Sequence, residues 1–221
     1  MKKCIIYSAF GNNCLNQAAI SAKVAKNNIK EDISLILHTE ERSVLTDDHQ
    51  VFDKILRQKK PEALKYKIYG FKIKGMIEAC KRLNFDYFLF LDTDAVIQKA
   101  EALEIFDLLK HFDIAAAHAP CRIAGEKINS IPDCFPEFNT GVIVFKKNIL
   151  PTLKQWLELY LSEFIKHPHD QGAFRNAVYF SNLRIATLPP EYNHRGTNRT
   201  NCLVWHNDQC IEYFRKKHDQ S

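Results

Sequence analysis

Several features that define other protein classes are missing from this chain of 221 residues. No run approaches the ~20 consecutive apolar residues that span a bilayer, so no membrane-spanning helix is expected. The seven cysteines form no Cys-x-x-Cys pair and no zinc-ligand spacing, which indicates reduced, mostly buried thiols in a reducing compartment. Glycine is equally scarce, with seven residues, and Gly11-Asn12-Asn13 is a poor version of the glycine-rich basic loop of a nucleotidyltransferase. These absences exclude zinc modules and argue against nucleotidyltransferases.

A strong charge of one sign is also missing. The chain has 31 basic and 26 acidic side chains, a net charge of +5, and its one local basic cluster is Arg215-Lys216-Lys217. Nucleic acid is therefore not an expected partner, whereas an anionic small molecule is. We expect a cytoplasmic protein, with the basic C-terminal cluster as a candidate for peripheral contact with a membrane.

What the chain does have is a regular alternation of strand and helix signals, with no internal repeat or linker. This predicts a single layered α/β domain over residues 1–221. Runs that are apolar at nearly every position indicate strands buried on both faces of a mostly parallel sheet, at 4–9, 33–37, 87–91 and 141–145. Apolar residues at a spacing near 3.6 predict helices over about 15–29, 46–60, 71–83 and 150–165.

The strongest chemical signal is a pair of carboxylates, Asp92 and Asp94, directly after an apolar strand. Successive side chains of a strand point to opposite faces, so these two carboxylates can point together while Thr93 points away. Ligands bind at the carboxyl ends of the strands in such sheets, and carboxylate oxygens suit a hard divalent cation. The pattern predicts a metal site able to neutralise a diphosphate. The alternative is a pair of solvated turn residues, because aspartate favours turns.

Polar residues stand beside three other predicted elements. Asn139 and Gly141 lead into a buried strand, where asparagine offers a donor and an acceptor and glycine permits close approach. Asp170 and Gln171 open a helix, although helix capping alone would explain an aspartate there. His206 follows an apolar run, and imidazole nitrogen together with carboxylate oxygens suits Mn²⁺ as well as Mg²⁺.

In their order and approximate spacing, these motifs resemble those of glycosyltransferases with the GT-A fold that use a nucleotide-sugar donor. The resemblance is greatest to the glycogenin and galactosyltransferase type of family eight. It spans nearly the whole chain and rests on Lys74 in the helix before D-x-D, the D-x-D itself, F-N-T-G-V, D-Q-G, L-P-x-x-Y-N and the late histidine. It implies a mostly parallel central sheet flanked by helices, with a nucleotide-binding half (about 1–98) and a sugar- and acceptor-binding half (about 99–221).

The resemblance also implies a role for each matching residue. The metal, Mn²⁺ or Mg²⁺, would be held on the donor diphosphate by Asp92, Asp94 and His206. The donor would be contacted by Ala9, Phe10, Gly11, Asn12, Lys74, Thr93, Asn139, Thr140 and Gly141, with Asp170 and Gln171 as the catalytic candidates at the reacting carbon. The implied reaction moves a sugar from a nucleotide diphosphate, with uridine as the expected base, to a hydroxyl of a glycan or lipid-linked acceptor. An inverting enzyme would need a base, for which Asp170 comes before Glu191 and Glu40, whereas a retaining enzyme would not.

One element of the family pattern is absent. In the family the late histidine is followed by G-x-x-K-P-W, whose lysine meets the diphosphate, whereas here His206 is followed by Asn-Asp-Gln-Cys. The candidates to replace that lysine are Arg195, Arg199 and Lys216.

Two other functions fit parts of the sequence. The residues from Asp92 to Val96 match the D-x-D-x-[TV] motif of haloacid dehalogenase-type phosphatases, in which Asp92 would be the phosphorylated nucleophile. Those enzymes need a later strand ending in an acidic pair, and the one adjacent aspartate pair, Asp47-Asp48, lies upstream. The other alternative is a non-catalytic carbohydrate- or nucleotide-binding module, against which the presence of both D-x-D carboxylates argues.

Overall fold

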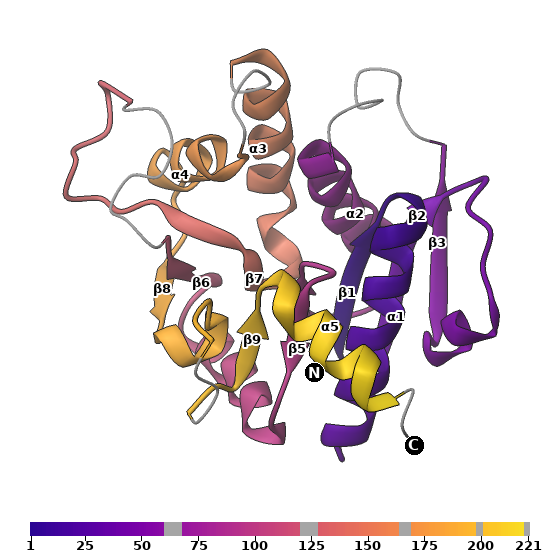
Figure 1. Cartoon of the computed structure of the whole chain (residues 1–221). Coiled ribbons are helices and arrows are strands. Elements are labelled where there is room, and N and C mark those ends of the chain that lie inside the picture. Colours follow the sequence, from indigo (N-terminus) through magenta and orange to yellow (C-terminus); the bar gives the residue numbers. More distant parts are fainter. Residues whose placement is uncertain (60–67, 120–127, 164–168, 198–200, 219–221) are drawn as a thin grey trace.

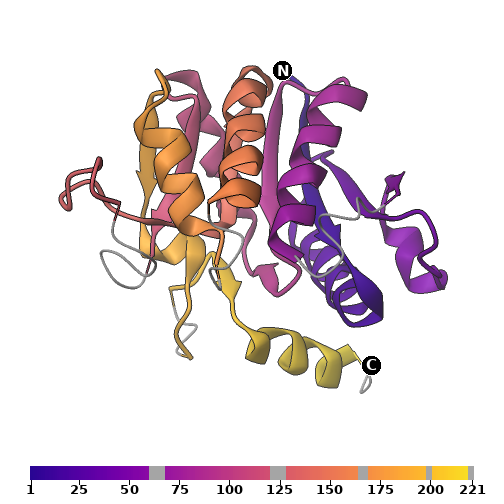
Figure 2. The same ribbon diagram turned by 90° about the horizontal axis from the view of Figure 1, so that it is seen from above.

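The protein is built around a seven-stranded sheet (Figures 1 and 2). The structure, a computed structural model, describes residues 1–59, 68–119, 128–163, 169–197 and 201–218. The strand order is β3-β2-β1-β4-β7-β6-β8, and only β7 runs antiparallel to its neighbours among these described strands. The strands are β1 (Lys3–Ala9), β2 (Ser34–Glu40), β3 (Lys54–Gln58), β4 (Tyr87–Leu91), β6 (Ile114–His118), β7 (Phe138–Lys146) and β8 (Ile185–Leu188). The predicted mostly parallel sheet is therefore confirmed.

Helices cover both faces of this sheet. Side by side on one face lie α2 (Ile68–Arg82), α3 (Leu150–Ser162) and α4 (Gln171–Tyr179). On the other face lie α1 (Gly11–Asn28) and the 3₁₀ segment η3 (Ala100–Lys110). A two-stranded antiparallel ribbon of β5 (Ala95–Ile97) and β9 (Val204–His206) leads into α5 (Asp208–His218), which lies beside α1. Shorter 3₁₀ turns are η1 (Asp47–Val51), η4 (Lys147–Ile149) and η5 (Pro190–Asn193).

The central strand β4 is buried at every position because each of its faces packs against a different layer. On β4, Leu89 and Leu91 belong to the core shared with α1 and η3, whereas Phe88 and Phe90 belong to the core shared with α2, α3 and α4. All four side chains are fully buried. Burial of one such side chain stabilises the fold by about 1.5–3 kcal/mol. The two cores hold β4 rigidly, and its carboxyl end is where the D-x-D begins.

The helix predicted over 46–60 is wrong. This segment forms the short turn η1 and then the edge strand β3, which pairs in parallel with β2. Leu56 is buried in the core, while Lys54 and Arg57 are exposed, as suits charged residues on a strand at the edge of a sheet. Apolar spacing over so few residues is weak evidence for a helix. The pairing of this segment with β2 decides its structure.

Six cysteines lie in the described ranges, where no disulfide joins any two of them, and Cys121 lies outside those ranges. Among the described helices, none combines the length and the apolarity needed to cross a membrane. Of the basic C-terminal cluster, Arg215 and Lys216 are exposed on α5, and the side chain of Lys217 lies outside the described part.

Candidate functional site

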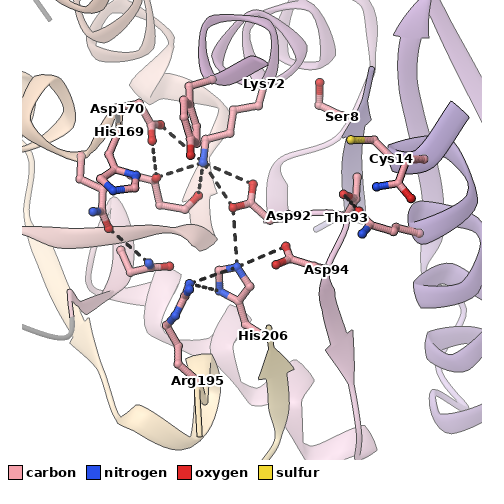
Figure 3. A pocket seen from close by; sticks show the side chains of 16 residues that line it. Ser8, Cys14, Lys72, Asp92, Thr93, Asp94, His169, Asp170, Arg195 and His206 are labelled. Carbon is pink, nitrogen blue, oxygen red and sulfur yellow. Dashed lines mark hydrogen bonds and ion pairs between the residues drawn. The ribbon is translucent and has the colours of Figure 1, made fainter. Parts of the chain in front are cut away.

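A cavity of about 500 Å³ opens at the carboxyl ends of β1 and β4 (Figure 3). Because β7 runs antiparallel to β4, the start of β7 lies at the same edge and brings Asn139 and Thr140 into the lining. The first residues of α4 contribute Asp170 and Gln171, and the end of β9 contributes His206. We call this the site cavity. The site cavity brings together predicted residues from the ends or beginnings of separate strands and helices.

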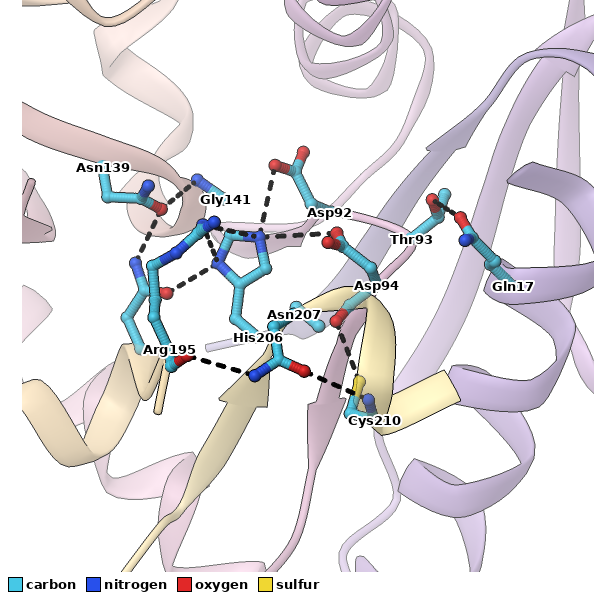
Figure 4. Close-up of polar contacts among 12 residues, drawn as sticks. Gln17, Asp92, Thr93, Asp94, Asn139, Gly141, Arg195, His206, Asn207 and Cys210 are labelled. Atoms are coloured by element: carbon cyan, nitrogen blue, oxygen red, sulfur yellow. Dashed lines mark hydrogen bonds and ion pairs between the residues drawn. The ribbon is translucent and has the colours of Figure 1, made fainter. Parts of the chain in front are cut away.

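Two strand registers bring the carboxylates to the imidazole. The pairing of β4 with β7 continues for one residue, since the backbone N–H of Asp92 donates to the carbonyl of Gly141 at 2.7 Å. In the β5–β9 ribbon Ala95 pairs with His206, so Asp94 is next to that histidine. Nε2 of His206 is 3.4 Å from Oδ1 of Asp94 and 3.7 Å from Oδ2 of Asp92 (Figure 4). The three ligand atoms lie within 4.8 Å of one another.

Glycine is required at position 141 because the ring of His206 lies against its α-carbon. A methyl group there would be 2.7 Å from both ring nitrogens and closer still to Cε1. The sequence predicted that this glycine permits close approach, and the structure identifies the group that approaches as the imidazole.

The imidazole is buried, with 3% of its side chain exposed. Its Nδ1 lies 2.7 Å from Oδ1 of Asn193, and Nη1 of Arg195 lies 3.5 Å from both ring nitrogens. Burial raises the pKa of Asp94, but the neighbouring His206 and the charge of Arg195 outweigh it and hold that pKa below its usual range. The site therefore favours an ionised Asp94, as a metal ligand must be.

A lysine that the sequence did not single out lies at the centre of the cavity. Nζ of Lys72 is 3.3 Å from Oδ1 of Asp92, 3.5 Å from Oδ2 of Asp170 and 3.0 Å from the hydroxyl of Thr140 (Figure 3). Burial lowers the pKa of Lys72, but the two aspartates outweigh that effect and raise it. Lys72 lies four residues before Met76 in α2, on the same buried face, and that spacing could have revealed it.

The structure places the predicted Lys74 outside the site cavity. Its Nζ pairs with Glu78 at 3.8 Å, and it lines a separate groove between α2 and α3. Of these two lysines, Lys72 is the one that lines the site cavity.

Asp170 does not cap α4 with its side chain. Its Oδ1 accepts from the hydroxyl of Thr140 at 2.9 Å, and the carboxylate is 1% exposed. Burial raises the pKa of Asp170, which the nearby charge of Lys72 opposes. Helix capping therefore does not explain this aspartate. Its carboxylate is buried and lines the site cavity instead.

Asn139 was expected to offer a ligand both a donor and an acceptor. Its Oδ1 already accepts from the N–H of Gly141 at 3.0 Å and from Nδ2 of Asn193 at 2.8 Å, while its Nδ2 donates to Gln171 at 3.2 Å. Because an amide oxygen accepts two hydrogen bonds, Asn139 keeps only one N–H for a ligand. The hydroxyl of Thr140 is likewise engaged by Lys72 and Asp170.

The stretch from Ala9 to Asn12 is not part of the cavity lining. Ala9 is buried in the core, Gly11 begins α1 with φ +75°, and the lining near them comes from Ser8, Asn13, Cys14 and Gln17. Thr93 also lines the cavity and donates to Oε1 of Gln17 at 2.9 Å, on the side away from the metal-ligand cluster. That direction follows the predicted alternation along the strand.

Of the three candidates to replace the family's diphosphate lysine, Arg195 lies in the site cavity. Lys216 is on α5 and is not part of the lining, and Arg199 lies outside the described residues.

A scan against protein-family models finds no match, and no curated protein matches the sequence. Solved structures do match. The galactosyltransferase LgtC, crystallised with donor and acceptor sugar analogs, has a TM-score of 0.68 at 14% identity, over 98% of this chain and 95% of that one. The fold is GT-A. A glycosyltransferase involved in glycosylation of the major capsid of PBCV-1 matches with a TM-score of 0.61 at 15% identity, over 98% of this chain and 100% of that one. The glycosyltransferase GlyE of Streptococcus pneumoniae TIGR4 matches with a TM-score of 0.63 at 13% identity, over 98% of this chain and 60% of that one.

Proposed function

We propose that this protein transfers a sugar from a nucleotide diphosphate, with uridine as the base, to a hydroxyl of a glycan or lipid-linked acceptor, and that Mn²⁺ or Mg²⁺ is required. One observation carries the proposal: Asp92, Asp94 and His206 converge at the carboxyl end of β4, inside the cavity of a GT-A fold. The sugar analogs bound to LgtC support the assignment of this cavity to the donor sugar.

The donor atoms suit such a cation. Two carboxylate oxygens and one imidazole nitrogen are ligands that Mn²⁺ accepts, and the carboxylates suit Mg²⁺. Asp92 and Asp94 are each about a quarter exposed, so they can be reached from the cavity. When bound, the cation supplies Lewis-acid stabilisation of negative charge on the leaving diphosphate, worth several kcal/mol.

Cationic side chains would bind the rest of the donor. Arg195 reaches the cavity from the loop before β9 and, by its position beside His206, is our candidate to contact the diphosphate. Lys72 is held between Asp92 and Asp170. We assign Lys72 to the sugar–phosphate junction, where its fixed charge costs no reorganisation during the reaction.

Asp170 and Gln171 would act on the sugar itself. Cleavage at the anomeric carbon builds positive charge on the ring, as in glycoside hydrolysis. The buried carboxylate of Asp170 would stabilise that charge, and the amide of Gln171, which also lines the cavity, would orient the ring. A retaining enzyme needs these roles alone. An inverting enzyme also requires a base that takes the acceptor proton, and Asp170 is our first candidate for it.

The phosphatase alternative loses its main support, because a GT-A fold is not the fold in which its motif works. The binding-module alternative is separated from catalysis by experiment. Purified protein is incubated with a panel of nucleotide sugars with and without Mn²⁺, and thermal stabilisation and release of nucleotide diphosphate are measured. We expect one donor with Mn²⁺ to raise the melting temperature by several degrees and to be turned over, because ligands stabilise the state that they bind. Stabilisation without turnover for every donor and acceptor would favour the binding module, and equal stabilisation without metal would contradict the proposed site.

A further inference from the structure

Behind His206 lies a row of buried amide side chains that ends at a carboxylate. Nε2 of Gln171 donates to Oε1 of Glu137 at 3.2 Å, and Nδ2 of Asn139 donates to Oε1 of Gln171 at 3.2 Å. Nδ2 of Asn193 donates to Oδ1 of Asn139 at 2.8 Å, and Oδ1 of Asn193 lies 2.7 Å from Nδ1 of His206. All five residues are buried, with at most 8% exposed, so water does not compete for these bonds.

The row has a fixed direction. A carboxylate only accepts, so Glu137 turns the NH₂ group of Gln171 toward itself and the oxygen of Gln171 toward Asn139. The backbone N–H of Gly141 fixes the same orientation independently, because it donates to Oδ1 of Asn139 at 3.0 Å. That oxygen in turn requires the NH₂ group of Asn193, so the oxygen of Asn193 is left to face the imidazole.

We infer that Asn193 is a positioning residue that keeps the hydrogen of the neutral imidazole on Nδ1 of His206 and leaves the lone pair of Nε2 facing Asp92 and Asp94. The competing tautomer carries its hydrogen on Nε2, which could donate to Oδ1 of Asp94 only 3.4 Å away. That tautomer cannot bind a cation through Nε2. A hydrogen bond to the other ring nitrogen is how outer-shell groups select the metal-binding tautomer of histidine.

The role of this tautomer in metal binding rests on the proposed function. The position of the hydrogen on the ring does not, and it can be tested without metal. The test uses the full-length, metal-free protein labelled with ¹⁵N-histidine. Long-range ¹H–¹⁵N spectra report which ring nitrogen carries the hydrogen, and His206→Gln identifies the signal. We expect Nδ1–H in the wild type. An Nε2–H tautomer would overturn the inference, whereas failure to bind Mn²⁺ with an Nδ1–H tautomer would count against the proposed function alone.

Variants then test whether Asn193 is the cause. Asn193→Leu should shift the tautomer toward Nε2–H and weaken Mn²⁺ binding about 10–100-fold, the usual effect of losing an outer-shell partner. Asn193→Asp keeps an acceptor opposite Nδ1 and should restore both readouts in part. Glu137→Met should have a smaller effect than Asn193→Leu, because the N–H of Gly141 still orients Asn139. Asn28→Leu, which removes a half-buried asparagine bonded to two carbonyls elsewhere, is the control. An unchanged tautomer in Asn193→Leu, or no rescue by Asn193→Asp, would refute the role.

Discussion

The contact between Gly141 and His206 gives the most specific prediction for the proposed metal site. Gly141→Ala would place a methyl group 2.7 Å from both ring nitrogens. The methyl group would be closer still to Cε1. Since nonbonded atoms prefer separations of about 3.5–4.0 Å, the ring must retreat by more than about 1 Å. Ligand distances in a metal site tolerate changes of only about 0.2 Å. His206 should therefore be lost as a ligand while Asp92 and Asp94 stay in place.

The magnitude follows from that displacement. We expect Mn²⁺ affinity to fall at least about 10–100-fold, the range that weaker perturbations of a metal site already produce. A 1 Å misplacement in an active site costs about 100-fold in rate, so kcat/KM should fall by a similar factor. The fold should survive, because overpacking one position typically costs about 1–3 kcal/mol.

Isothermal titration with MnCl₂ in the presence of the donor nucleotide measures the affinity, and circular dichroism checks the fold. Gly196→Ala is the matched control, since its methyl group would meet the side chain of His194 at 3.0 Å and leave the three ligands alone. In a background that already carries His206→Ala, Gly141→Ala should add almost nothing to the loss. Wild-type affinity in Gly141→Ala would refute the assigned role of His206, as would full additivity with His206→Ala.

Three further predictions concern other residues. Lys72→Met leaves the buried carboxylate of Asp170 without its cation, so the free energy of unfolding should fall by about 3–5 kcal/mol in urea denaturation, and Asp170→Asn added to it should recover part of this loss. Burial lowers the pKa of His38 to about 4, so the unfolded chain binds a proton below pH 6.5 that the folded protein refuses. Acidification from pH 6.5 to 4 should therefore cost about 3 kcal/mol more in the wild type than in His38→Gln, and equal pH profiles of unfolding would contradict this. Asp94→Asn should abolish stabilisation by Mn²⁺ plus donor, whereas unchanged stabilisation by metal would remove Asp94 from the site.

Much of this site could be predicted because its residues follow short-range rules. Asp92 and Asp94 stand after a run that is apolar at every position, and such a run forms a central strand whose carboxyl end faces ligands. His206 ends a second apolar run, and Gly141 begins a third. Strand alternation also gave the direction of Thr93 correctly.

The remaining features depend on contacts between residues far apart in the sequence. The burial of Lys72 is decided by Asp170, which approaches from a different helix, and a lysine on a helix is usually solvated. The importance of Asn193 arises only once η5 packs beside β7 and β9. Likewise β3 is a strand because β2 offers it an edge, and a local spacing of apolar residues carries no information about that edge.

The central claim is that a divalent cation joins Asp92, Asp94 and His206 to the diphosphate of a nucleotide donor. Pulsed electron paramagnetic resonance of Mn²⁺ bound with uridine diphosphate tests it most directly. We predict ³¹P coupling from the diphosphate and ¹⁴N coupling from one imidazole, the latter lost in His206→Ala. An Mn²⁺ complex whose spectrum and affinity do not change in His206→Ala and Asp92→Asn would contradict the claim.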